Sequence, residues 1–310
     1  MPAQGAARPA RVRVPASTSN LGAGFDCLGL ALDFYLEASF MPGNGQLRSE
    51  RTGSLAGLAG EDLLVECFRQ GLGERGIDAG GVVNATSEIP IGRGLGSSAS
   101  ATVAGLALAA VAAGESLEPL GLLGPAVARE GHPDNAAPAL FGGFVGVVPD
   151  DSDLVVIRLP LSPDIAFAWA APARQVGTRE AREALPAAVP HGVATRALSR
   201  TVALVQGMAV GDAALIRSGF SDELHVPHRL PLIPGGVDAM RAAEAAGAWA
   251  VTISGSGSGL IAACPRGTEA AVAEAMAAAF RATAADPAAR SGIIARPVYP
   301  DMSGLQVLSP

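Results

Sequence analysis

Residues 88–105, EIPIGRGLGSSASATVAG, place a glycine- and serine-rich stretch directly before an alanine-rich apolar run. The alternating glycines of residues 92–96 permit positive φ angles and let the backbone approach a ligand closely. Ser97 or Ser98 can cap the helix that the apolar run predicts over residues 97–113, whose first turn presents unpaired N–H donors. Such an arrangement binds phosphate, although a plain glycine-rich turn before a capped helix fits this stretch equally well.

The composition excludes several classes of protein that handle phosphate groups. All 22 basic residues are arginine, so the chain contains no lysine. Walker-A loops, protein kinases and pyridoxal enzymes each require a lysine at the reacting centre. Phosphate chemistry in this chain must therefore rest on backbone N–H groups, hydroxyls, a metal ion and arginine.

Size, charge and cysteine content indicate the number of domains, the kinds of partner and the cellular compartment. The 310 residues are 49% hydrophobic, enough for two ordinary domains, and the net charge of −7 argues against nucleic acid as a partner. The apolar run over 99–113 is shorter than the ~20 residues of a membrane span, and residues 1–10 lack the apolar core of a secretory signal. Cys27, Cys67 and Cys264 are isolated, as in a reducing compartment. We expect a cytoplasmic protein with no membrane partner.

The order of apolar segments favours an α+β fold with two domains. Strands and helices alternate, but short strands also occur in pairs, which is unlike a doubly wound parallel sheet. The turn-forming stretch PDDSD (149–153) and a strand over 154–159 place the boundary near residue 160, giving domains 1–160 and 161–310. We also expect one buried strand over residues 140–148.

Two further stretches carry polar groups suited to the same site. ISGSGSG (253–259) is a second glycine and serine loop after a strand, as a tight hairpin would also be. Glu130, in REGHPDNAAP, matches the oxygen ligands of Mg²⁺ when combined with a loop serine, whereas alone it fits an exposed helix end. Arg179, Arg182 and Arg229 are candidates for binding a carboxylate, although most arginines are solvated surface.

Taken together and in this order, the stretches resemble the motifs of the GHMP small-molecule kinases. The matching stretches are VPASTSNLGAGFDCLGLAL, EIPIGRGLGSSASA, EGHPDNAAPALFGGF, TREAREALP, VPHRLPLIPG and ISGSGSG, which span residues 14–259. HPDN together with TSNLGAGFD is typical of the homoserine kinase branch. The resemblance implies an N-terminal domain like ribosomal protein S5 and a ferredoxin-like C-terminal domain, with the active site between them.

The resemblance also implies a reaction and its cofactors. The γ-phosphoryl group of ATP would pass, with Mg²⁺, to the side-chain hydroxyl of L-homoserine, giving O-phospho-L-homoserine in threonine biosynthesis. Ser98 and Glu130 are the implied metal ligands. The implied ATP-binding residues are Asp62, Pro90, Ile91, Gly92, Arg93, Gly94, Leu95, Gly96, Ser97, Ser98, Ala99 and Ser100.

Residues that match the family's amino-acid site lie elsewhere in the chain. Asn20 and Asp26 would meet the α-amino end of the substrate, and its carboxylate would meet two guanidinium groups. The full set of implied substrate contacts is Asn20, Asp26, His132, Asn135, Thr178, Arg182, Arg229 and Gly257. The implied catalytic residues are Ser98, Glu130, Asp134 and Asn135. We hypothesise that Asp134 fixes the loop carrying Asn135 rather than acting as a base.

Four positions depart from the family pattern, and two alternatives stay open. Ser258 replaces a usual proline and should loosen its turn, while Asp62 replaces an asparagine near the adenine and bears on nucleotide preference. Val226 replaces a glutamate, and Pro231 replaces a basic residue. A homodimer is typical of the family. The alternatives are another GHMP kinase, acting on a mevalonate-type or sugar alcohol, and a non-catalytic ligand sensor on the same fold.

Overall fold

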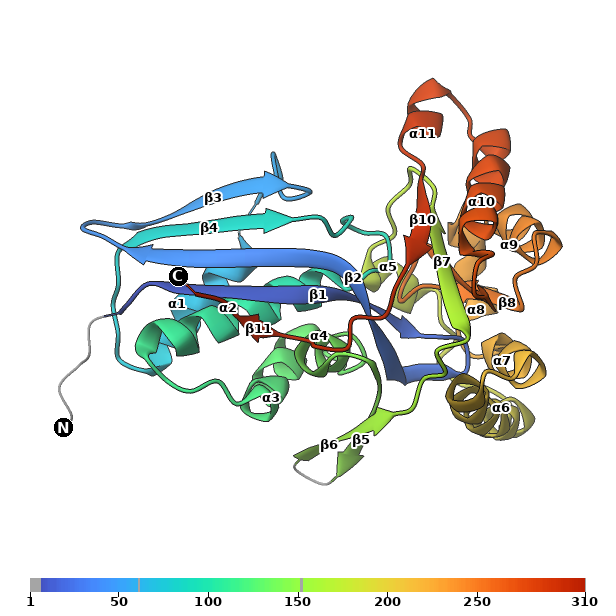
Figure 1. Ribbon diagram of the computed structural model, residues 1–310, viewed down its shortest axis with the longest axis horizontal. Helices are drawn as coiled ribbons and strands as arrows, with labels where there is room; N and C mark the ends of the chain where they lie inside the picture. Colours follow the sequence, from blue (N-terminus) through green and yellow to red (C-terminus); the bar gives the residue numbers. More distant parts are fainter. Residues whose placement is uncertain (1–6, 61, 151–152, 310) are drawn as a thin grey trace.

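The computed structural model describes residues 7–60, 62–150 and 153–309, which form two β-sheets with helices packed against them (Figure 1). The first sheet is built on a long antiparallel hairpin of β1 (Ala10–Asn20) and β2 (Gly24–Pro42). The C-terminal part of β2 (residues 36–42) pairs with β4 (Gly81–Ser87), and β4 pairs in parallel with β3 (Leu47–Gly53). The N-terminal part of β2 (residues 28–30) pairs with β5 (Phe144–Asp150), which in turn pairs with β6 (Asp153–Leu159).

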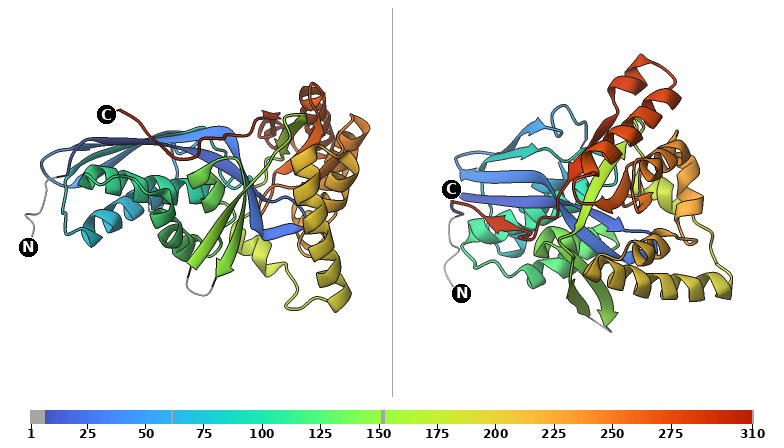
Figure 2. Two further views of the ribbon diagram at one scale, coloured as in Figure 1. Left: turned by 60° about the horizontal axis from the view of Figure 1, so that its bottom comes forward. Right: turned by 45° about the vertical axis from the view of Figure 1, so that its right-hand side comes forward.

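The helices of the first domain lie on one face of this sheet, as the left view of Figure 2 shows. They are α1 (Leu63–Glu74), α2 (Ser97–Ala113), α3 (Pro119–Glu130) and α4 (Ala136–Phe141). α2 is buried on nearly all sides because its sequence is apolar all round, as expected of a central helix. Gly105 lets α1 approach α2 closely, since a Cβ there would lie 2.4 Å from the carbonyl oxygen of Leu64.

The second sheet has the order β10–β7–β9–β8 and is antiparallel throughout. Its strands are β7 (Ile165–Ala171), β8 (Ala250–Ile253), β9 (Leu260–Pro265) and β10 (Ile294–Val298). One face packs on α9 (Gly236–Ala245) and α10 (Glu269–Thr283). The other face joins the core of the first domain, where Trp169 meets Phe34 edge to face at 5.8 Å.

The remaining elements complete the second domain and return the chain to the first. They are α5 (Thr178–Glu183), α6 (His191–Val210), α7 (Ala213–Phe220), α8 (Val226–Arg229), the 3₁₀ helix η1 (Leu230–Leu232), α11 (Pro287–Ser291) and β11 (Gln306–Val307). The chain leaves the first sheet after β6 and comes back after β10, so that β11 pairs with the free side of β1. The described helices include none with the length and apolar character needed to cross a bilayer.

The α+β architecture and the helix over residues 97–113 are confirmed. The single strand expected over residues 140–148 is wrong, because α4 continues to Phe141 and β5 begins only at Phe144. A short run of buried apolar residues has no periodicity that separates helix from strand. The crossing between the sheets lies between Leu159 and Ile165, beside the boundary expected near residue 160.

Candidate active site

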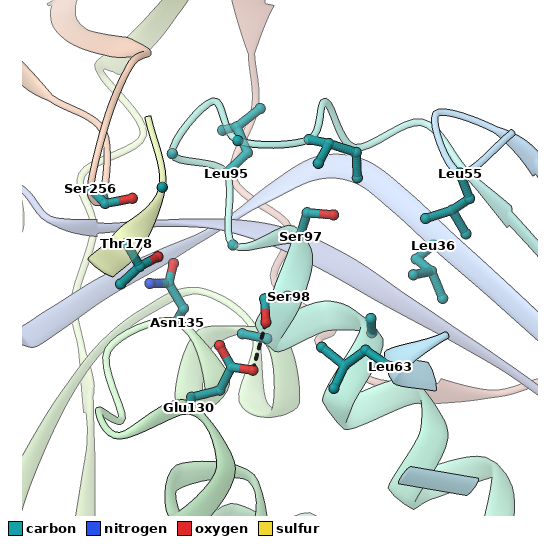
Figure 3. A pocket seen from close by; sticks show the side chains of 18 of the residues that line it. Leu36, Leu55, Leu63, Leu95, Ser97, Ser98, Glu130, Asn135, Thr178 and Ser256 are labelled. Atoms are coloured by element: carbon teal, nitrogen blue, oxygen red, sulfur yellow. Dashed lines mark hydrogen bonds between the residues drawn. The ribbon is translucent and has the colours of Figure 1, made fainter. Parts of the chain in front are cut away.

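A cavity of about 340 Å³ lies where the loop before α2 faces the second domain (Figure 3). Ile91, Gly92 and Gly94 to Ala99 form one wall, and the end of α3 with its following turn forms another. Residues 176–178 and 255–256 close it from the second domain. Figure 3 shows Ser97 and Ser98 at the start of α2, with Thr178 and Ser256 across the cavity. Pro90, Arg93 and Ser100, also expected at the nucleotide, are outside this lining.

The expected positive φ angles of the loop glycines are confirmed. Gly92, Gly94 and Gly96 have φ values of 65°, 72° and 64°. The expected serine cap is wrong: Gly96 occupies the N-cap position, and in the described parts of the chain no side chain caps α2. Ser98 instead directs its hydroxyl to Glu130. The first N–H groups of α2 are therefore available to an anion at the cavity, where the helix dipole favours negative charge.

The two glycine loops are in direct contact. Ser254 Oγ donates to the carbonyl oxygen of Gly94 at 2.6 Å, and a Cβ on Gly94 would lie 1.9 Å from the Ser254 carbonyl oxygen. The loop between β8 and β9 is thus both a hairpin connection and a wall of the cavity. Gly255 and Ser256 line the cavity, whereas the expected substrate contact Gly257 lies against Ile233.

Ser98 and Glu130, the expected metal ligands, are in direct contact. Ser98 Oγ donates to Glu130 Oε1 at 2.8 Å, and Thr102 Oγ1 donates to the same oxygen at 2.8 Å. Both hydroxyls come from α2, one turn apart, and the carboxylate from the end of α3. A carboxylate and a hydroxyl beside a phosphate-sized cavity are hard oxygen donors of the kind Mg²⁺ prefers, so these residues fit that ion. Thr102 is not among the residues predicted from sequence, although it lies four residues after Ser98 and so on the same helix face.

The far end of the cavity is apolar and holds the departure at Asp62. Its lining includes Leu36, Leu55, Leu58 and Leu63, which suit a flat base. Asp62 is the N-cap of α1, accepting from Val65 N at 3.3 Å, and its other oxygen accepts from Ser49 Oγ at 2.6 Å. The carboxylate is therefore a local structural group as well as part of the cavity wall.

The expected amino-acid contacts gather beside the cavity. Arg182 on α5 and Asp26 on β2 form a two-pronged ion pair, with N–O distances of 2.8 and 3.1 Å. Asn20 Oδ1 accepts from the backbone N–H of Asp26 at 3.0 Å, and Asn20 Nδ2 donates to the carbonyl oxygen of Gly255 at 2.9 Å. Residues 156 positions apart in the sequence thus form one polar cluster, which adjoins the cavity through Gly255.

Arg229 is the most buried of the expected carboxylate-binding residues, with 2% of its surface exposed. Its Nε donates to the carbonyl oxygen of Ala181 at 3.2 Å, and its guanidinium lies 5.1 Å from the ring centroid of Phe25. Burial, followed by the nearby charge of Arg182, lowers its pKa. Among the residues described, no carboxylate pairs with Arg229. A bound anion would therefore pair with a guanidinium that is already desolvated. Arg179, in contrast, is an exposed surface residue paired with Glu183.

The turn between α3 and α4 carries the remaining candidates. Asp134, 2% exposed, accepts a hydrogen bond from His132 Nδ1, and His132 faces the cavity. Burial lowers the pKa of His132, but the hydrogen bond and charge of Asp134 outweigh burial and leave that pKa above its usual value. Asn135 also lines the cavity, but Ser17 Oγ donates to its Oδ1 at 3.0 Å and its Nδ2 donates to Ser19 Oγ at 2.9 Å.

The other departures from the family pattern have local roles. Ser258 is fully buried and its hydroxyl donates to the carbonyl oxygen of Arg174, so its turn is tied to the segment before α5 rather than loosened. The backbone N–H of Val226 donates to Asp222 Oδ2 at 2.8 Å, and this contact needs no particular side chain at position 226. Pro231 lies within η1.

Comparison with known proteins places this arrangement in a family. Models of the N-terminal and C-terminal domains of GHMP kinases match residues 62–143 and 205–282. A homoserine kinase of Thermus thermophilus is 40% identical over 270 residues, covering 86% of this chain and 91% of that protein. This chain belongs to the GHMP kinase family. The expected two-domain GHMP kinase fold is confirmed, and the chain is an ATP-dependent small-molecule kinase.

Other GHMP kinases are similar to this chain at different levels of sequence identity. A homoserine kinase of Moorella thermoacetica is 39% identical over 87% of this chain and 92% of its own length. The crystal structure of homoserine kinase from Cytophaga hutchinsonii superposes with a TM-score of 0.85 at 30% identity, covering 99% of this chain and 100% of that one. A mevalonate kinase structure, at 11% identity and a TM-score of 0.67 over 94% of this chain and 99% of the other, shares the fold.

Proposed function

We propose that this kinase transfers the γ-phosphoryl group of ATP to the side-chain hydroxyl of L-homoserine, giving O-phospho-L-homoserine in threonine biosynthesis. The observation that carries the proposal is the cluster of Asp26, Arg182 and buried Arg229 beside the phosphate loop. A zwitterionic amino acid requires both signs of charge, whereas a mevalonate-type or sugar alcohol has no group for Asp26 to neutralise. Homoserine is also the substrate named for the Thermus and Moorella relatives.

The residues that line the cavity suit the parts of a nucleotide. The N–H groups of the loop and of the first turn of α2 bind the phosphates, and the leucine-lined end receives the base. Ser98 and Glu130 would hold Mg²⁺, which when bound neutralises charge on the phosphate oxygens. With no lysine in the chain, the remaining positive charge comes from arginine.

At the acceptor end, the charged groups orient the amino acid. Asp26 binds the ammonium group, and Arg182 with Arg229 binds the carboxylate bidentately. Asp26 and Arg182 pair with each other before substrate arrives, so the zwitterion exchanges one ion pair for two. Asp26 and Arg182 therefore each have a partner of opposite charge both before and after the substrate binds.

Phosphoryl transfer depends mainly on in-line positioning, which is the role we assign to the α3–α4 turn. His132, Asn135 and Thr178 line the cavity between the nucleotide and acceptor ends. Asp134 is buried behind His132 and outside the lining, which supports a role in fixing this turn rather than in removing the hydroxyl proton.

The test is an ADP-release assay with L-homoserine, mevalonate and galactose as acceptors, each with ATP and with GTP, at graded Mg²⁺ concentrations. We expect turnover with homoserine, dependence on Mg²⁺ and no turnover with the other two alcohols. Activity confined to mevalonate or galactose would reject the assignment. Binding of nucleotide without turnover of any acceptor would favour a ligand sensor.

The assembly and location of the kinase are separate proposals. We propose a homodimer in the cytoplasm, with no membrane or nucleic-acid partner. Light scattering on the purified chain measures the mass in solution, and a monomer across the micromolar range would reject the dimer.

A further inference from the structure

The turn that precedes Asp26, and Asp26 itself at the start of β2, are held in a strained backbone conformation. Asn20, Leu21 and Asp26 have φ angles of 70°, 48° and 55°. Residues other than glycine rarely adopt this left-handed region, because Cβ approaches the following carbonyl oxygen. Such conformations persist only where surrounding contacts over-determine them. Those contacts therefore identify what positions the carboxylate of Asp26.

The second domain supplies contacts to the middle of the turn. The backbone N–H of Ala23 donates to the carbonyl oxygen of Gly219 at 2.9 Å, and the Ala23 carbonyl oxygen accepts from Thr201 Oγ1 at 2.7 Å. The adjacent residue, Gly22, has its carbonyl oxygen 3.1 Å from Nε2 of His225. Helices α6 and α7 and the residue before α8 thus each hold this turn.

His225 also contacts the buried substrate arginine. Its Nδ1 lies 3.4 Å from Nη1 of Arg229, a long hydrogen bond, and its ring stacks on Phe25 with centroids 5.1 Å apart. The guanidinium of Arg229 lies over the same Phe25 ring. One imidazole therefore touches both the turn that precedes Asp26 and the guanidinium that faces the substrate carboxylate.

The two contacts define the protonation state of this imidazole. A carbonyl oxygen only accepts and a guanidinium only donates, so the hydrogen is on Nε2 and the lone pair is on Nδ1. Burial lowers the pKa of His225 to about 4, although the charge of Asp222 acts in the opposite direction. This lowered pKa favours the same neutral ring. The charged groups facing the ring are Asp222, Arg229 and Asp26.

The ring is also fixed at its base. Asp222 Oδ2 accepts from the backbone N–H groups of His225 at 2.7 Å and Val226 at 2.8 Å, and its Oδ1 accepts from Leu224 N at 2.9 Å. His225 itself is fully buried and lies outside the cavity lining. It can therefore act on a bound substrate only through its neighbours.

We propose that His225 is a positioning residue for the acceptor: by bridging Gly22 and Arg229 it sets the spacing between Asp26 and Arg229 that recognises an α-amino acid. The proposal rests on the proposed homoserine kinase function. Its consequence is selective, since loss of the bridge weakens acceptor binding and leaves the nucleotide end of the cavity unchanged.

The experiment compares His225→Phe, which keeps the stacking on Phe25 but removes both ring nitrogens, with His225→Gln, whose single amide cannot bridge both partners. The exposed His191→Phe is the matched control. We expect His225→Phe to raise the KM for homoserine about tenfold, as the loss of one buried hydrogen-bonded bridge predicts. The KM for ATP should stay within about twofold, and His225→Gln should fall between wild type and His225→Phe.

Several outcomes overturn the proposal. Equal increases in both KM values, or a lower melting temperature with both KM values unchanged, would show a merely structural residue. If His225→Phe does not fold, His225→Gln decides the question, and a wild-type KM for homoserine in that variant overturns the proposal. A wild-type enzyme that ignores homoserine but phosphorylates another alcohol refutes the proposed function instead. The same variants are then measured with that alcohol, and an unchanged acceptor KM rejects the role of His225.

Discussion

Substitution of Gly94 by alanine is expected to separate the two glycine loops and to disable the nucleotide site. The new Cβ would lie 1.9 Å from the carbonyl oxygen of Ser254, whereas real Cβ contacts essentially never fall below 3.0 Å, so the loops must move apart by about 1 Å. Alanine at a φ of 72° costs about 1–2 kcal/mol, and the 2.6 Å hydrogen bond from Ser254 contributes about 1 kcal/mol more. We therefore expect the free energy of unfolding to fall by about 2–3 kcal/mol.

The kinetic effect should exceed the effect on stability. A displacement of about 1 Å in a group that positions the reactants can lower the rate about 10²-fold. We expect kcat/KM for ATP to fall by that factor at saturating acceptor. Urea unfolding and ADP release measure the two quantities on the same sample. The matched control is Gly73→Ala in α1, where no atom would lie within 4 Å of the new Cβ and where the helix should gain up to ~1 kcal/mol. Wild-type stability and nucleotide kinetics in Gly94→Ala would refute the contact between the loops.

Three further predictions concern charged and titratable side chains. Glu130→Gln keeps the shape of the side chain but removes its charge, and it should raise the Mg²⁺ concentration for half-maximal turnover about tenfold or more. A Mg²⁺ titration at saturating ATP measures this concentration. An unchanged titration would show that Glu130 is not a metal ligand. Asp26→Asn and Arg182→Met should each raise the KM for homoserine, and the double variant should fall short of the summed effects because the two groups pair with each other; strict additivity would contradict that pairing. The pKa of His225 is lowered from 6.5 to about 4, so between these pH values the unfolded chain binds more protons than the folded chain. The free energy of unfolding should therefore fall as the pH drops through this window, by up to about 3 kcal/mol. Urea unfolding at pH 7 and pH 4.5 measures the fall, which should be smaller in His225→Gln.

The sequence could predict those parts of the site whose cause is local. The loop before α2 and the helix itself follow from glycine spacing and an apolar run within 26 consecutive residues (88–113), and both form as expected. The contact between Ser98 and Glu130 joins residues 32 positions apart, and it is the resemblance to the GHMP kinases that indicates Ser98 as the serine beside Glu130. Local signals fail where two arrangements have the same pattern, as at α4, where a buried apolar helix has a sequence that fits a strand equally well.

The contacts that position these groups could not be predicted, because they join distant parts of the chain. Ser17 and Ser19 on β1 fix the amide of Asn135, and sequence alone gives no reason to connect them. The same holds for His225, whose ring bonds to the carbonyl oxygen of Gly22, 203 residues earlier in the chain. Each of these residues is a buried polar group whose role is set by what the fold brings next to it.

The route of the chain between the two sheets has a consequence for how the protein is made. The second domain is an insertion between β6 and the C-terminal strand β11, so two separate crossings join the domains. The last residues cover the outer side of β1, where Leu308 N donates to the carbonyl oxygen of Arg11 at 2.9 Å. During synthesis that edge of β1 stays open until the second domain and then β11 have been made, so the first domain to emerge is completed only after the second. Removal of the C-terminal ten residues should expose this edge and promote aggregation through it.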